Sequence, residues 1–127
     1  MNMLLLSAGI IAVAVGLVHS ALGEVLIFKK LRNGTVVPTI GQPILKERNV
    51  RILWATWHIV TIFGWAFGAT LIYLSSEAIE INPTIGLFLN LVACSMLASS
   101  FLVLFATKAK HPGWVGLLAV AVLCWLS

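Results

Sequence analysis

The sequence predicts an all-α protein, an integral membrane four-helix bundle with up-down-up-down connectivity. Three observations lead to this class. Hydrophobic residues make up 61% of the 127 residues and charged residues 9%, whereas a soluble domain has roughly 45–50% apolar and about 25% charged residues. The apolar residues form four segments, and helices are required there because lipid offers no hydrogen-bond partner to an unpaired backbone. The basic residues gather in two of the intervening loops, which is a topology signal.

We expect a single transmembrane domain over residues 1–127, with lipid as its surroundings and no nucleic-acid partner. A membrane-spanning helix needs about 20 residues, and the first three helices are long enough. The fourth has 16 residues, so it crosses only a thinned bilayer or ends with its carboxylate near the far interface. The first segment lacks a basic n-region and is interpreted as a retained helix. The predicted helices are 3–28, 50–74, 83–106 and 112–127, with a loop at 29–49.

Turn residues support these boundaries. Asn82 followed by Pro83 has the form of an N-cap with proline in the first helical position. His111-Pro112-Gly113 precedes the fourth helix in the same way. In the first loop, Asn33-Gly34 interrupts regular structure.

The charges predict how the helices cross the membrane. Loop two carries Glu77 and Glu80 and no basic residue. The positive-inside rule therefore places loops one and three in the cytoplasm and both termini outside, in a multi-pass protein of the bacterial inner membrane. The middle of loop one is apolar, which indicates either a loop on the membrane surface or a lid over the cytoplasmic mouth of the bundle. The basic residues are Lys29, Lys30, Arg32, Lys46, Arg48 and Arg51 around loop one, and Lys108 and Lys110 in loop three.

Ionisable side chains within the apolar segments are the strongest candidates for function, because a charge is costly at membrane depth. They are His19 and Glu24 in the first segment and His58 in the second, with Arg51 and His111 at the cytoplasmic boundary. At 1.5 Å per residue, the two span histidines lie about 13 Å and about 10 Å from that boundary. We therefore expect one polar layer, to which Ser20, Thr61, Ser99 and Ser100 also belong.

Helical periodicity predicts which faces meet. Gly16 and Gly23 lie beside His19 and leave room for a flat or bulky group. In the second helix one arc holds Arg51, Trp54, His58, Thr61, Trp65 and Gly68. In the first, a seam for close packing holds Ala8, Ala12, Gly16, Ser20 and Glu24. We expect His19 and His58 to face each other and to form one site with Glu24 or His111 on its cytoplasmic side.

Structural roles are the alternatives for each of these residues. Either histidine can serve only as a hydrogen-bond partner between helices, and His111 can start or cap the fourth helix. Glu24 is predicted to be ionised and paired with Arg48 or Arg51. Trp54 and Trp57 suit an aromatic belt, Trp65 suits the core, and Cys94 and Cys124 are expected to be free, buried thiols.

Three short motifs carry a resemblance to a family. They are His19-Ser20-Ala21-Leu22-Gly23-Glu24, Trp54-x-x-Trp57-His58 and His111-Pro112-Gly113-Trp114. With these motifs, the chain resembles a family of small four-span bacterial inner-membrane proteins without an assigned activity. The resemblance implies the architecture and a bacterial origin, and it implies no reaction.

The residues favour a haem- or metal-binding membrane protein of redox type. Imidazoles on facing helices can hold haem iron, and histidine with glutamate can hold a transition metal. The expected cofactor contacts are His19, His58, Arg51 and Trp54, and the expected metal ligands are His19, His58, Glu24 and His111. The alternatives are a site for a lipid headgroup or an anionic small molecule, with or without an enzymatic reaction, a small transporter or proton relay acting as a homo-oligomer, and an accessory subunit of a larger membrane complex.

Overall fold

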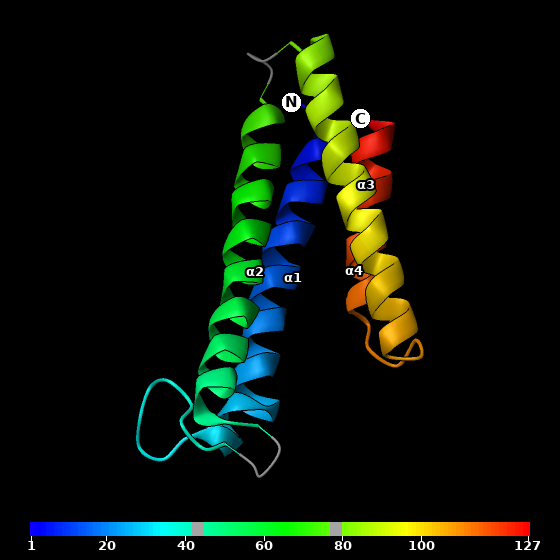
Figure 1. Cartoon of the computed structure of the whole chain (residues 1–127). Helices are drawn as coiled ribbons and strands as arrows, with labels where there is room; N and C mark the ends of the chain where they lie inside the picture. Colours follow the sequence, from blue (N-terminus) through cyan, green and yellow to red (C-terminus); the bar gives the residue numbers. More distant parts are fainter. Residues whose placement is uncertain (42–44, 77–79) are drawn as a thin grey trace. The chain divides into compact units, whose positions relative to one another are not determined.

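A computed structural model describes residues 1–41, 45–76 and 80–127. Within these ranges the protein is all-helical and contains no strand, which confirms the all-α part of the predicted class. Three helices, α1, α2 and α3, are long and apolar enough to cross a membrane, whereas α4 is shorter. Figure 1 shows the helices α1 (Met3–Leu26), α2 (Glu47–Leu74), α3 (Pro83–Ala106) and α4 (Gly113–Leu126), with the short 3-10 helix η1 (Phe28–Leu31) after α1.

Two predicted boundaries differ by two or three residues, and α4 is one residue shorter at each end than the predicted 112–127. The first helix ends at Leu26 rather than at residue 28, because the chain tightens into η1 and buries Phe28. The second helix begins at Glu47 rather than at residue 50. An ion pair of 2.8 Å between Glu47 and Arg51, one turn apart, stabilises this additional first turn. An acidic side chain there also suits the positive end of the helix dipole.

The start of α3 is as predicted. Asn82 accepts a hydrogen bond from the backbone N–H of Ile85 at 3.0 Å, and Pro83 occupies the first turn. The start of α4 differs, since Pro112 precedes the helix without a side-chain cap. Instead, Nδ1 of His111 accepts the backbone N–H of Gly113 at 3.1 Å. His111 therefore has the capping role that was the structural alternative for it.

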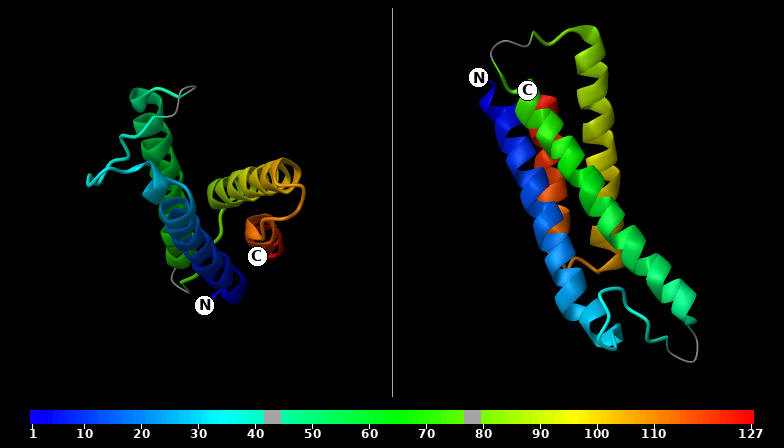
Figure 2. Two further views of the ribbon diagram at one scale, coloured as in Figure 1. Left: turned by 90° about the horizontal axis from the view of Figure 1, so that it is seen from below. Right: turned by 90° about the vertical axis from the view of Figure 1, so that its left-hand side faces the viewer.

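The chain forms two compact units. The first comprises residues 1–15 and 64–127, and the second comprises residues 16–63. Helices α1 and α2 each contribute one half to each unit, because both pass the division near their middle. Helices α3 and α4 belong wholly to the first unit, and they lie side by side in Figures 1 and 2.

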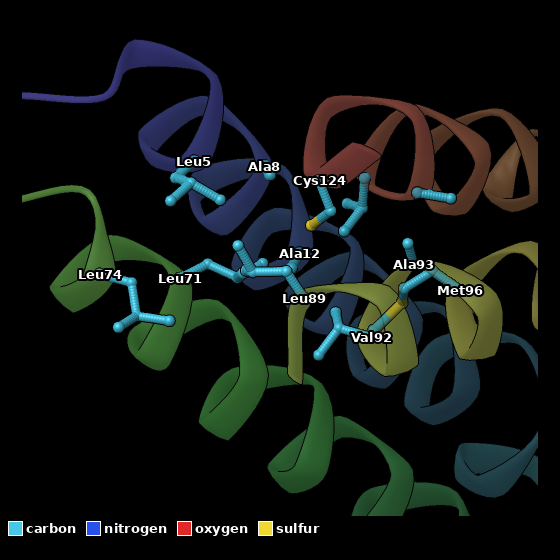
Figure 3. Packing of buried hydrophobic residues seen from close by; sticks show 12 residues of the cluster. Leu5, Ala8, Ala12, Leu71, Leu74, Leu89, Val92, Ala93, Met96 and Cys124 are labelled. Carbon is cyan, nitrogen blue, oxygen red and sulfur yellow. The ribbon is translucent and has the colours of Figure 1, made fainter. Parts of the chain in front are cut away.

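The first unit has an apolar core to which all four helices contribute (Figure 3). Ala8, Ala93 and Ala121 are fully buried, so the backbones that carry them approach closely. Ala8 and Ala12 are the N-terminal part of the predicted small-residue seam. The core consists of Leu5, Ala8, Ala12, Leu71, Leu74, Leu89, Val92, Ala93, Met96, Val120, Ala121 and Cys124.

Polar side chains in this unit mostly bond to backbone. The buried Ser100 donates its hydroxyl to the backbone oxygen of Trp114 at 2.7 Å and so joins α3 to α4. Ser99 is exposed. Of the two cysteines, Cys124 is buried as expected, but Cys94 is exposed because it lies on the outer face of α3. Trp65 is also not a core residue, since it is 40% exposed and its indole N–H reaches the backbone oxygen of Val13 at 3.2 Å.

The backbones of helices α1 and α2 approach closely at Gly9 and Gly68. A Cβ atom on Gly68 would lie 2.7 Å from Cγ2 of Val13 and 2.9 Å from the backbone oxygen of Gly9. One turn earlier on α2, a Cβ atom on Gly64 would have no neighbour within 4 Å. The absence of a side chain is therefore needed at Gly68 and not at Gly64.

We predict that Gly68→Ala destabilises the protein by about 1–3 kcal/mol, the usual cost of overpacking. The matched control Gly64→Ala should be neutral or stabilising by up to about 1 kcal/mol, since alanine favours helix over glycine. Unfolding by a denaturing detergent, followed by circular dichroism, measures both changes. Equal stability of the two variants would contradict a backbone contact at Gly68.

Candidate functional site

The second unit holds a polar network centred on the carboxylate of Glu24. The indole N–H of Trp54 donates to Oε1 at 2.6 Å, and Nε2 of His58 lies 2.8 Å from the same oxygen. The guanidinium of Arg32 pairs with Oε2. Both carboxylate oxygens therefore have donors, and the side chains of Glu24, Arg32 and His58 are only 28%, 26% and 25% exposed.

The network continues from His58 into the helix pair. Nδ1 of His58 lies 2.8 Å from Oγ of Ser20, and this oxygen lies 2.9 Å from Oγ1 of Thr61. Thr61 is buried, with 3% of its surface exposed. Glu24, His58, Ser20 and Thr61 thus form an unbroken hydrogen-bonded chain between α1 and α2, which we call the relay.

Helical spacing explains why these side chains meet. Ser20 and Glu24 are four residues apart on α1, so they lie on one face of that helix. Trp54, His58 and Thr61 follow one another at intervals of four and three residues on α2, and each contacts that face of α1. This part of the predicted arc and this part of the predicted seam are therefore confirmed as contact faces.

The donors around Glu24 determine the protonation pattern of the relay. Arg32 and the indole of Trp54 can only donate, so the carboxylate accepts at both oxygens and is ionised. Beside an ionised carboxylate, a neutral ring of His58 would carry its proton on Nε2, which faces Glu24. Nδ1 would then accept from the hydroxyl of Ser20, and Ser20 would accept from Thr61.

Glu24 is paired with a different arginine from the one predicted. Its partner is Arg32, which directly follows η1. Arg51 instead bonds to Glu47 at 2.8 Å and is exposed. The predicted pairing with Arg48 or Arg51 is wrong because α1 ends earlier and α2 begins earlier than predicted. The shorter α1 places η1 and Arg32 near Glu24, and the longer α2 gives Arg51 a partner in Glu47.

His19 has different neighbours from His58. Its ring stacks on the indole of Trp57, with centroids 4.4 Å apart and planes inclined by 9°. The indole N–H of Trp57 also donates to the backbone oxygen of His19 at 3.1 Å. A Cβ atom on Gly23 would overlap this indole, so Trp57 itself fills the space predicted beside His19. The structure gives no support to a site shared by the two rings.

The expected metal ligands make other contacts in this structure. In the part of the chain that the structure describes, no three His, Cys, Asp or Glu side chains are grouped to hold a metal ion. Of the expected ligands, only Glu24 and His58 are in contact. His19 stacks on Trp57, and His111 caps α4 in the other unit.

The expected cofactor contacts are likewise engaged within the protein. Arg51 bonds to Glu47, and Trp54 donates to Glu24. The ring of Trp54 also meets His58 edge to face, with centroids 4.9 Å apart. Trp54 therefore does more than form part of an aromatic belt, since it positions both members of the Glu24–His58 pair.

The first loop is tied to this unit through η1. Phe28 is buried and meets Trp57 edge to face, with centroids 5.7 Å apart. The backbone N–H groups of Thr39 and Ile40 both donate to the backbone oxygen of Leu31, at 3.0 Å and 2.9 Å. These bonds return the loop to η1, next to the residue that pairs with Glu24. Residues 42–44 of the predicted lid lie outside the described residues.

Comparisons with protein-family models, with curated proteins and with solved structures found no match to this chain. The chemistry of the site is therefore the basis for assigning a function. Two of the three sequence motifs supply Ser20, Glu24, Trp54 and His58 to it.

A double-mutant cycle should distinguish the observed ion pair from the one predicted. We expect Glu24→Gln and Arg32→Gln to be coupled by about 1 kcal/mol, because each removes the same partly buried pair. The matched cycle of Glu24→Gln with Arg51→Gln should be additive to within about 0.5 kcal/mol. Unfolding free energies in detergent give both values, and coupling of Glu24 to Arg51 rather than to Arg32 would contradict this assignment.

Proposed function

We propose that this protein is a multi-pass membrane protein with an intramembrane acid–base site. In this proposal His58 exchanges a proton with the hydroxyl of Ser20, and Glu24 orients the ring and stabilises its protonated form. The observation that supports it is the unbroken relay between two apolar helices. Chains of ionisable and hydroxyl groups at membrane depth are characteristic of proton transfer.

The relay has two consistent hydrogen-bond patterns. With a neutral ring, Ser20 donates to Nδ1 of His58 and accepts from Thr61. With a protonated ring, Nδ1 donates to Ser20, and the Ser20 hydroxyl turns to donate to Thr61. All oxygen and nitrogen positions can stay in place, since the distances of 2.8 Å and 2.9 Å suit either direction. A proton can thus be taken up and released by rotation of hydroxyl groups.

The contacts of His58 favour acid–base chemistry over haem or metal binding. A metal ligand uses the lone pair of one ring nitrogen and commonly donates its other N–H to a carboxylate. Here Nε2 faces Glu24, as in a metal site, but Nδ1 is already bonded to Ser20. Binding a metal would therefore require the Ser20–His58 bond to break.

The protein also has a defined orientation in the membrane under this function. We place loops one and three on the cytoplasmic side of the bacterial inner membrane and both termini outside. The distribution of Lys and Arg over these loops supports this placement. The site then opens toward the cytoplasm, because Arg32 and η1 belong to loop one.

We predict that the neutral ring of His58 carries its proton on Nε2. Nuclear magnetic resonance of ¹⁵N-histidine-labelled protein in the alkaline range, where histidines are neutral, distinguishes the two ring nitrogens. Glu24→Gln should change the tautomer ratio of His58, because the amide can also donate to Nε2. The matched variant Glu47→Gln should leave the ratio unchanged, since Glu47 bonds to Arg51.

The same experiment tests the proposed exchange. On acidification we expect both ring nitrogens of His58 to become protonated reversibly while the helical signal persists. A ring fixed on Nδ1–H would contradict the relay geometry. A ring that never takes up a second proton in the folded protein would contradict the acid–base function.

The orientation is tested by cysteine labelling in bacterial cells. In a background without Cys94 and Cys124, Thr35→Cys should react with an impermeant maleimide only after the cells are permeabilised. Glu80→Cys should react in intact cells. Both positions lie in exposed parts of the chain. Labelling of Thr35→Cys in intact cells would show that loop one is outside.

A further inference from the structure

Ser20 is hydrogen-bonded differently from other serines of this chain. Its hydroxyl contacts a ring nitrogen at 2.8 Å, and the opposite nitrogen of that ring faces a carboxylate at 2.8 Å. By contrast, four other serines donate their hydroxyl to a backbone carbonyl, which cannot accept the proton. These are Ser75, Ser95, Ser100 and Ser127.

We propose that Ser20 is a nucleophile for acyl transfer from carboxylic esters of membrane lipids. A hydroxyl, a base within hydrogen-bond reach and a third group that orients the base form the arrangement that activates serine. Ser20, His58 and Glu24 occupy these three positions in order. This inference rests on the proposed acid–base function and adds the reaction and the substrate class.

The surroundings of Ser20 favour an ester in the lipid phase. Ser20 is partly exposed and lies in α1, a helix apolar enough to cross a membrane. Next to it on this helix, Leu17 and Val18 are 54% and 53% exposed. A lipid ester can reach such a surface by lateral diffusion, whereas a charged soluble substrate would lose its hydration there.

The reaction is balanced by groups of this chain and by water. Oγ of Ser20 bonds to the ester carbonyl carbon as its proton moves to Nδ1 of His58, and Glu24 stabilises the resulting imidazolium. The bond between the carbonyl carbon and the alcohol oxygen then breaks, and the alcohol takes the proton from Nδ1. Water attacks the acyl-serine with the same base, which releases the carboxylic acid and restores the Ser20 hydroxyl.

Thr61 is suited to assist this step. Its hydroxyl lies 2.9 Å from Oγ of Ser20 and has no charge of its own. Once Ser20 has bonded to carbon, the Thr61 hydroxyl is a donor beside the oxygen on which negative charge develops. Thr61→Val should therefore slow acylation while the tautomer of His58 is maintained.

A fluorophosphonate probe tests the nucleophile in the purified full-length protein in detergent. The serine oxygen bonds to phosphorus, fluoride leaves and the proton goes to His58, so the adduct reports activation without a known substrate. We expect one adduct, mapped to Ser20 by peptide mass spectrometry. His58→Gln should slow its formation by about 100-fold or more, in the range of general-base catalysis. Ser95→Ala and Ser100→Ala should react like the unchanged protein.

The outcomes separate the two proposals. If Ser20 forms no adduct while His58 shows the Nε2–H tautomer and reversible protonation, the nucleophile proposal is wrong and the acid–base site stands. If Ser20 reacts equally fast in His58→Gln, with helix content retained, activation by His58 is wrong. If the His58 tautomer is reversed, the proposed function fails together with this inference.

Discussion

The carboxylate of Glu24 is the group on which the second unit depends. An ionised carboxylate within an apolar helix is costly unless it is paired and hydrogen-bonded. Three donors meet this requirement: Trp54 and His58 from α2, and Arg32 from the residue after η1. Their positions set the rotation of α2 against α1 and hold η1 in place. One electrostatic requirement therefore determines both the local fold and the orientation of the His58 ring.

Close helix approach supports this network by limiting the space around it. Gly23 leaves room for the indole of Trp57, which stacks on His19 and packs against the buried Phe28. Aromatic groups of this chain thus fill the volume that a flat cofactor would need. In the first unit Gly9 and Gly68 have a comparable effect, since they let two backbones meet without a side chain between them. Such contacts are typical of helices that pack in an apolar solvent, where burial from water contributes little.

Helical periodicity predicted which residues of the candidate site share a helix face, and it predicted nothing further about the site. Spacings of three and four residues put Ser20 with Glu24, and Trp54 with His58 and Thr61, on single faces, and these faces are in contact. Periodicity does not say which neighbouring group takes each hydrogen bond. His19 and His58 were predicted to share a site because they lie at similar depths in their helices. In the structure their rings have different partners. The choice of Arg32 over Arg48 or Arg51 depends on η1, a turn that no pattern in the sequence predicted.

The sequence by itself determined the all-helical class, three helices suited to span a membrane and the start of α3. These follow from composition, length and local turn chemistry, all of which act between residues close in the chain. Only the tertiary structure decided that Glu24 is the centre of the site and that Ser20 faces His58. Those outcomes depend on distances between side chains up to 38 residues apart. Such distances depend on how each helix is rotated about its own axis. The rotation that gives the buried polar groups the most favourable hydrogen bonds is the one that is stabilised.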